Sequence, residues 1–341
     1  MFVPCLNGFR NDESFMQEVT DCSPLVTIVI PVFNVEKYIS QCLESVLAQS
    51  YENLEVICID DCGSDSSVDI LSGYIQADRR IRLIKHNKNL GLGPARNTGL
   101  KKARGEYIYF LDSDDWIEKD AIGLMVKQAI DTKADVVIAS AEAFPDEEKE
   151  EDLKDEVKRK NEWLDVSSAL MTIDEQRFDY AIRHIPCIAC GKLYKTKFLL
   201  KNELFFINRK VLHEDNGFHL KVMSCEPTIC SFEKRLYKYR IRSSSLMSFG
   251  AKESGSDKAM AIALEDAMVY LRSAKKASWM IQVIKDVYWK HFLKSFCGFA
   301  FFWGRSQKRL SLCGISVFKQ TVTRKNKTKI TLLGIPLYIG K

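Results

Sequence analysis

Short apolar runs alternate with helix-length segments from residue 26 to about residue 140. The apolar runs predict buried strands at Val26–Ile30, Glu55–Ile59, Ile81–Lys85, Tyr107–Leu111 and Ala134–Ala139. The segments between them have helical periodicity and predict helices at Val35–Gln49, Ser66–Ala77, Pro94–Ala103 and Lys119–Asp131. Strands separated by helices of this length form βαβ units. The pattern therefore predicts an α/β fold, with a Rossmann-like, mostly parallel sheet flanked by helices.

The rest of the chain departs from this alternation. Residues 142–162 form a charge-rich insertion, which we expect to be a solvated helix or loop. Mixed elements follow to about residue 250, and the pattern of Asp257–Trp289 predicts a helix. We therefore expect an N-terminal extension at 1–24, a main domain at 25–250 and a helical, basic C-terminal region at 251–341. Within the main domain, 25–140 is the nucleotide-binding half and 163–250 the acceptor half.

Composition favours a folded globular protein, because 46% of the 341 residues are hydrophobic and 28% are charged. The longest uncharged apolar run, residues 295–304, is too short to span a membrane, and the N-terminus lacks the pattern of a signal peptide. These features predict a cytoplasmic protein. The 11 cysteines are odd in number and scattered. Cys187-x-x-Cys190 with Cys225 and Cys230 is a weak zinc pattern, since the second pair lacks the CxxC spacing.

An apolar run that ends in acids carries the clearest functional signal. Tyr107–Leu111 is followed directly by Asp112-Ser113-Asp114-Asp115. Carboxylates at the exit of a buried strand are costly unless a cation neutralises them, and open α/β sheets bind ligands at that edge. The simplest reading is Mg²⁺ or Mn²⁺ held by one or two carboxylates and by substrate phosphates. A helix N-cap is the alternative that these residues alone leave open.

Two more segments lie at the same predicted edge. Asp60-Asp61 follows a strand, and a carboxylate there can accept a hydrogen bond from a nucleobase imide or a ribose hydroxyl, although a turn with an N-cap also explains it. The run from Gly91 to Gly99 fails the dinucleotide-binding fingerprint because Arg96 stands where glycine is needed. It fits better a loop entering a helix, with Arg96 and Asn97 facing a phosphate-bearing or sugar ligand.

Taken together, IVIPVFNVEKYISQCLESVLAQSYENLEVICIDDCGSDSS and NLGLGPARNTGLKKARGEYIYFLDSDDWI resemble the family 2 glycosyltransferases of the GT-A fold, of the bacterial surface polysaccharide or lipopolysaccharide type. The resemblance covers about residues 24–140 and continues more weakly through Gly191–Tyr194 and Leu212–Phe218. It implies that Asp112 and Asp114 bind Mn²⁺ or Mg²⁺ on the diphosphate of a nucleotide sugar. Asp114 is then the more direct metal ligand, and Asp112 and Ser113 also contact the donor.

The resemblance also assigns the nucleoside end of the donor. Asp61 is expected to contact uracil, while Pro31 and Asn34 line the base and the ribose. The donor is therefore expected to be a UDP-sugar. One departure from the family pattern is Gly63, where many relatives have Ser, so any contact from that side chain is lost.

The segment His213-Glu214-Asp215 resembles the family's acidic pair before an aromatic residue. The resemblance makes Asp215 the general base of an inverting transfer, which needs one base for the acceptor hydroxyl. The leaving diphosphate needs no acid where a metal stabilises it. An ordinary helix start is the alternative for this pair. A QxxRW motif, typical of many processive relatives, is absent, which favours transfer of a single sugar.

Charge is distributed unevenly along the chain. Residues 271–341 carry 15 Lys and Arg and one acid, Asp286, for a net charge of +14 within a total of +5. Aromatic residues interleave with these cations at Trp279, Tyr288, Trp289, Phe292, Phe296, Phe299, Phe301, Phe302 and Trp303. Nucleic acid binding uses the same residue types. Given the resemblance we expect instead the inner leaflet of the plasma membrane, where a lipid-linked acceptor is found, and no nucleic acid partner.

The sequence therefore predicts a metal-dependent, inverting hexosyl- or N-acetylhexosaminyltransferase that is peripheral on the inner face of the membrane. Its acceptor is expected to be a glycan or a lipid-linked glycan. One alternative is a catalytically inactive GT-A-like protein that binds membranes or polyanions. A sugar-nucleotide pyrophosphorylase is less favoured, because the segment after the first strand lacks a glycine-rich, basic phosphate loop.

Overall fold

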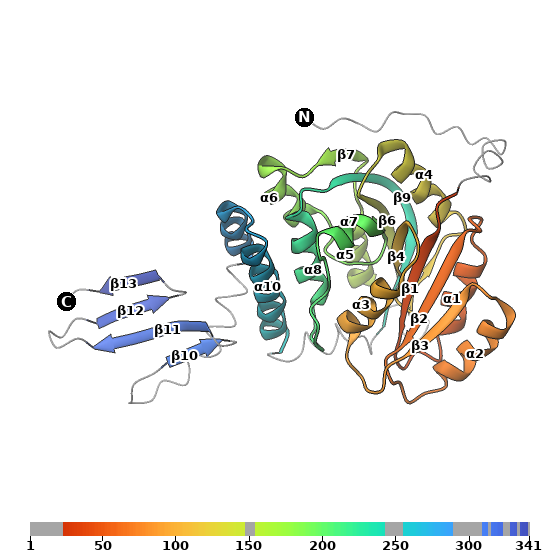
Figure 1. Cartoon of the computed structure of the whole chain (residues 1–341), viewed down its shortest axis with the longest axis horizontal. Helices are drawn as coiled ribbons and strands as arrows, with labels where there is room; N and C mark the ends of the chain where they lie inside the picture. Colours follow the sequence, from red (N-terminus) through yellow and green to blue (C-terminus); the bar gives the residue numbers. More distant parts are fainter. Residues whose placement is uncertain are drawn as a thin grey trace. The chain divides into compact units, whose positions relative to one another are not determined.

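The structure, a computed structural model, describes residues 23–146, 154–242 and 255–288, together with four strands between residues 309 and 339. The chain divides near residue 291 into two compact units (Figure 1). Most of the predicted N-terminal extension and the aromatic residues after 288 lie outside the described residues. No described helix is long and apolar enough to cross a membrane.

A mixed, nine-stranded sheet forms the core of the described first unit, in the order β3-β2-β1-β4-β8-β6-β9-β5, with β7 paired to β9. Its parallel half consists of β1 (Val26–Val32), β2 (Leu54–Asp60), β3 (Ile81–Lys85) and β4 (Tyr107–Phe110). Every residue of β1, β2 and β4 is buried, which is why these strands read as apolar runs. The predicted α/β fold is confirmed.

Helices connect these parallel strands: α1 (Ile39–Leu47), α2 (Ser67–Ala77) and α3 (Leu92–Lys102). Figure 1 shows α1 and α2 on one side of the strands and α3 on the other. The predicted helix from Pro94 begins two residues earlier, because proline is tolerated in the first turn of a helix. The next helix, α4 (Ala121–Thr132), packs on the second half of the sheet.

The second half of the sheet is built from β5 (Trp116–Ile117), β6 (Val136–Pro145), β7 (Ala169–Thr172), β8 (Lys192–Lys195) and β9 (Thr228–Ile241). Around it lie α5 (Lys154–Leu164), α6 (Glu175–His184), α7 (Thr196–Lys201), α8 (Glu214–Met223) and α10 (Gly255–Ser273), and α10 packs against α8. The expectation that all of 142–162 is a solvated helix or loop was wrong for 142–145. These residues extend β6 because β9 pairs with them.

The single helix predicted over Asp257–Trp289 is interrupted. The first part, α10, ends at Ser273, and helical structure resumes at 278. Lys275 has a φ of 52°, the left-handed conformation that commonly ends helices. The described strands of the second unit are β10 (Arg309–Leu312), β11 (Ile315–Val322), β12 (Thr328–Leu332) and β13 (Ile335–Ile339). Each of them pairs antiparallel with the next.

Close packing of α3 on β1 depends on Gly99. A Cβ at this position would lie 2.3 Å from Val29 Cγ1, within a fully buried strand. We expect Gly99→Ala to lower the free energy of unfolding by about 1–3 kcal/mol, measured by urea denaturation. Gly73→Ala is the matched control, because nothing lies within 4 Å of that Cβ and alanine favours the helix. Equal stability of the two variants would contradict this packing.

Candidate active site

The carboxyl ends of β1, β2 and β4 meet at one edge of the sheet. Val32 pairs with Asp60 at the end of β1 and β2, and Phe110 of β4 lies opposite Val29. The register therefore places the acids after β2 and the acids after β4 at the same edge, as the sequence predicted.

The three carboxylates after β4 have different partners. Asp112 Oδ1 accepts a hydrogen bond of 2.8 Å from Arg96 Nη2, and Asp114 Oδ2 lies 2.6 Å from Arg242 Nη2. Asp115 is buried and accepts hydrogen bonds from the Tyr237 hydroxyl (2.5 Å) and from the backbone N–H of Arg240 (2.7 Å). Asp115 therefore fixes β9 to this edge, while Asp112 and Asp114 each pair with an arginine side chain.

Burial and mutual repulsion make this cluster receptive to a cation. Burial raises the pKa of Asp114; Arg242 opposes the shift and Asp112 adds to it. Burial likewise raises the pKa of Asp115 well above its usual range, and Asp114 and Asp112 add to that shift. Carboxylate oxygens are the ligands that Mg²⁺ and Mn²⁺ prefer, so the donor set fits such an ion. Among the described residues no group of three or more metal-ligating side chains converges, so phosphates and water would complete the coordination.

Arg96 on α3 joins the acids after β4 to the acids at the start of α8. Its side chain is 1% exposed, and Nη1 donates to Glu214 Oε1 at 2.9 Å and to Asp215 Oδ1 at 2.6 Å. Its Nη2 donates to Asp112. The ring of Phe206 lies 5.3 Å from the guanidinium carbon. One buried cation therefore holds the predicted donor acid and the predicted base in a single hydrogen-bonded group.

Glu214 and Asp215 differ in exposure and in protonation. The Asp215 side chain is 19% exposed and that of Glu214 is 7% exposed. Burial and the nearby charge of Asp215 raise the pKa of Glu214 to about 8, although Arg96 opposes the shift. Burial also raises the pKa of Asp215, against the effect of Arg96. The raised pKa therefore favours the protonated form of Glu214 at neutral pH, while Asp215 is the more accessible partner of Arg96.

Asp61 directly follows β2 at this edge of the sheet and is buried. Its Oδ1 accepts hydrogen bonds from the backbone N–H of Leu90 (2.9 Å) and lies 2.7 Å from His86 Nδ1. Its Oδ2 accepts from the backbone N–H of Gly91 at 2.7 Å. A carboxylate oxygen can accept two hydrogen bonds, so Oδ2 retains capacity for one more. The contact of Asp61 with uracil stays a prediction.

The other residues predicted to contact the donor differ in exposure. Pro31 is buried in β1, while Asn34 is exposed, has a φ of 52° and accepts a hydrogen bond from the Ser64 backbone N–H. Asn97 is buried, and its side-chain amide donates to and accepts from the backbone of Phe206. Ser113 is buried between the acids. Asn97 thus supports the fold at this point, and the donor contacts of all four residues stay predictions.

The structure adds residues that the sequence reasoning missed. Glu214 was expected to be a neighbour of the base, yet it shares Arg96 with it. His86 supports Asp61, and the Tyr237 hydroxyl supports Asp115. No local sequence signal marks these partners. His86 lies 25 residues from Asp61 and Tyr237 lies 122 residues from Asp115. Glu214 is connected to Asp215 through Arg96, which lies 118 residues before Glu214. Arg240 donates to the backbone carbonyl of Asp114, and Arg242 pairs with the Asp114 side chain.

Comparisons with known proteins agree with this geometry. The family description "Glycosyl transferase family 2" matches residues 27–199. Glycosyltransferase GlyA of Streptococcus pneumoniae is 34% identical over 222 residues, which cover 65% of this chain and 31% of GlyA. A putative glycosyltransferase of Bacillus subtilis, EpsH, is 33% identical over 232 residues, which cover 66% of this chain and 63% of EpsH. The chain thus spans less than two thirds of the length of either relative.

Two crystal structures share the fold. S. aureus TarS in complex with UDP-GlcNAc has a TM-score of 0.63 and 22% identity, covering 82% of this chain and 76% of that one. A mannosyltransferase from Pyrobaculum calidifontis in complex with GDP-Man and Mn²⁺ has a TM-score of 0.53 and 16% identity, covering 84% and 77%. These similarities show the GT-A-like α/β architecture of the first unit.

Proposed function

This chain belongs to glycosyl transferase family 2, and on that premise we propose that it moves one sugar from a UDP-sugar to a glycan or lipid-linked acceptor, with inversion. One observation carries the proposal. Arg96 holds Asp112, which faces the donor phosphates in this scheme, and Asp215, the proposed base, through hydrogen bonds of 2.8 and 2.6 Å. Donor activation and acceptor deprotonation therefore share one pre-organised centre.

The reaction is a single in-line displacement. Asp215 removes the proton from the acceptor hydroxyl as that oxygen attacks the anomeric carbon, and the bond from this carbon to the diphosphate oxygen breaks. A β linkage then forms from an α-linked donor. Asp215 suits the role because its side chain is 19% exposed and its Oδ1 accepts a hydrogen bond of 2.6 Å from Arg96. Glu214 does not, because it is protonated and nearly buried.

The family implies Mn²⁺ or Mg²⁺, and Asp112 and Asp114 are the residues that would hold it. When bound, such an ion supplies positive charge to the departing nucleoside diphosphate. Asp114 is paired with Arg242 through Oδ2 and Asp112 with Arg96 through Oδ1, so the other oxygen of each carboxylate lies outside that ion pair. Arg242 is the cation that pairs with Asp114, at 2.6 Å, beside the place where the diphosphate would lie.

The choice of a UDP-sugar rests on Asp61. Its Oδ2 can accept one further hydrogen bond, and the imide N–H of uracil is a donor of the required kind. Pro31 and Asn34 would line the nucleobase and the ribose of the donor. Asn97 and Ser113 would complete the donor site on the side of the phosphates. The TarS complex holds UDP-GlcNAc, whereas the mannosyltransferase complex holds GDP-Man. The experiment must therefore decide both the sugar and the nucleobase of the donor.

We further propose that the enzyme acts in bacterial surface polysaccharide biosynthesis, at the inner face of the plasma membrane. The names of GlyA and EpsH as glycosyltransferases and the +14 charge of residues 271–341 support this. The three regions proposed from the sequence, 1–24, 25–250 and 251–341, would then serve as extension, transferase domain and membrane-associating tail. An inactive polyanion-binding module is the second candidate, favoured only by that charge.

Release of nucleoside diphosphate from a panel of UDP-, GDP- and dTDP-sugars tests the proposed reaction. We expect slow hydrolysis of one UDP-sugar with Mn²⁺ and none with EDTA. Metal-independent release would contradict the proposed metal dependence. Release from no donor would contradict the proposed function and leave the inactive binding module.

A further inference from the structure

A lysine and two aromatic rings form a group between α5 and β9. Lys160 Nζ lies 4.4 Å from the ring centroid of Trp163, one turn along α5, and 4.7 Å from that of Tyr239 on β9. Trp163 is 39% exposed, although it is a large aromatic residue. An ammonium against two rings, one of them open to solvent, is an arrangement suited to a polar ligand with an apolar face.

This group adjoins the active centre. Tyr239 follows Tyr237 by two residues on β9, so the two side chains share a face of the strand, and the Tyr237 hydroxyl bonds to Asp115. Burial raises the pKa of Tyr239, and the charges of Asp115, Asp112 and Asp114 add to the shift. The next residue, Arg240, donates its backbone N–H to Asp115 Oδ1 at 2.7 Å, so Tyr239 lies beside the acids after β4.

Lys160 is in the same electrostatic environment. Burial lowers the pKa of its ammonium, and the charges of Cys187, Glu156, Asp115 and Asp215 act in the opposite direction. Among the described residues no carboxylate lies within ion-pair distance of Lys160. A partly buried cation without a salt bridge among these residues provides a site for an anionic group of a ligand.

We propose that Lys160, Trp163 and Tyr239 form an acceptor subsite for a sugar or polyol unit that carries a carboxylate or a phosphate. The inference rests on the proposed function, because it assigns the second substrate of that reaction. Trp163 provides a surface on which the unit packs, and Lys160 binds its negative charge. The unit that receives the new linkage then lies next to Asp215, with the charged group directed away from the acids.

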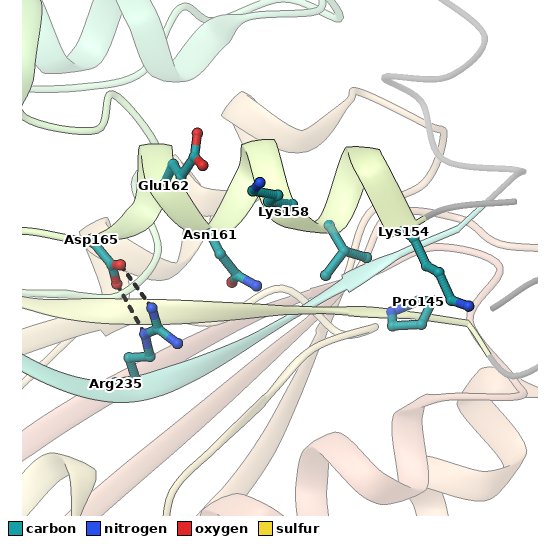
Figure 2. A pocket seen from close by; sticks show the side chains of 8 residues that line it. Pro145, Lys154, Lys158, Asn161, Glu162, Asp165 and Arg235 are labelled. Carbon is teal, nitrogen blue, oxygen red and sulfur yellow. Dashed lines mark hydrogen bonds and ion pairs between the residues drawn. The ribbon is translucent and has the colours of Figure 1, made fainter. Parts of the chain in front are cut away.

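A cavity of about 430 Å³ on another side of α5 is the competing place for an anion (Figure 2). Its lining includes Lys158 and Arg235, but Arg235 already makes two hydrogen bonds to Asp165, at 2.9 and 2.7 Å. Residues 158 and 160 are two positions apart on a helix, so their side chains point in different directions. Lys158→Gln is therefore a matched control for Lys160→Gln, with the same charge change on the same helix.

Ligand-observed NMR titration of the full chain, without donor, tests the subsite. The probes are p-nitrophenyl β-glucuronide for the carboxylate, glucose 6-phosphate for the phosphate, and p-nitrophenyl β-glucoside as the neutral reference. We expect one charged probe to bind roughly tenfold more tightly than the neutral one. Lys160→Gln should abolish this preference and Lys158→Gln should preserve it. Trp163→Ala should weaken all probes that bind, and Trp163→Phe should restore most of the affinity.

The proposal is overturned if no charged probe binds, if charged and neutral probes bind equally, or if Lys158→Gln has the same effect as Lys160→Gln. The charged probe that binds identifies the anionic group. The titration uses no donor, so a failure of the proposed transferase reaction would appear in the donor panel and not in these affinities.

Discussion

Replacing Asp215 by Asn is expected to lower the rate of sugar transfer by a factor of roughly 10²–10⁴, the usual contribution of a general base. Asn keeps the shape of the side chain and can still accept the hydrogen bond from Arg96, which is 2.6 Å long in the native protein. It cannot take the proton of an acceptor hydroxyl. The measurement is kcat for nucleoside diphosphate release, together with the affinity for UDP, which should change little.

Glu214→Gln is the control for this experiment. Because Glu214 is protonated at neutral pH, its amide analogue should retain most of the activity. The pH profile gives a second check. Burial raises the pKa of Asp215, so activity should be lost, as the pH falls, at a higher pH than for a free aspartate with a pKa of about 3.9. Loss of activity in Glu214→Gln with full activity in Asp215→Asn would make Glu214 the base.

The second large effect is expected on stability. Arg96→Met leaves Asp112, Glu214 and Asp215 without their shared buried cation. Removing one partner of a buried ion pair costs about 3–5 kcal/mol, and we expect a loss of that size in the free energy of unfolding, measured in urea. Arg183→Met is the control, because its pair with Asp179 is exposed and contributes under about 1 kcal/mol.

The pH dependence of the Arg96→Met deficit follows from the sign of the pKa shifts. Without the guanidinium, the buried acids should have folded-state pKa values further above their unfolded values. The folded state of Arg96→Met then binds more protons than its unfolded state. The loss in free energy of unfolding, relative to the wild type, should therefore become smaller as the pH is lowered from about 8 to about 5. An Arg96→Met protein as stable as Arg183→Met would show that the acids do not depend on Arg96.

Local pattern was sufficient to predict the parallel half of the fold. Runs such as Val26–Ile30 and Tyr107–Leu111 are buried on both faces, which is typical of strands inside a parallel sheet. The register of parallel strands then brings Asp61 and Asp112 to one edge. Both the strands and the edge could be predicted because they depend on short stretches of sequence.

The antiparallel half and the partners in the site depend on tertiary structure. β8 enters the sheet between β4 and β6, which requires pairing with residues 84 to 88 positions away in β4 and 54 to 58 positions away in β6. Arg96 was expected to face a phosphate or sugar, and its carboxylate partners Glu214 and Asp215 lie 118 and 119 residues away. Sequence alone also does not separate Glu214 from Asp215, because the difference is one of burial and protonation.

Equilibrium dialysis of radiolabelled UDP tests most directly the claim that these acids form one metal-dependent active centre. We expect the wild type and Asp215→Asn to bind UDP with Mn²⁺ and to lose that affinity in EDTA. Asp114→Ala should bind weakly in both conditions, whereas Asp120→Asn, an exposed acid at the start of α4, should behave as wild type. UDP binding that is the same with Mn²⁺ and EDTA, and unchanged in Asp114→Ala, would contradict the account.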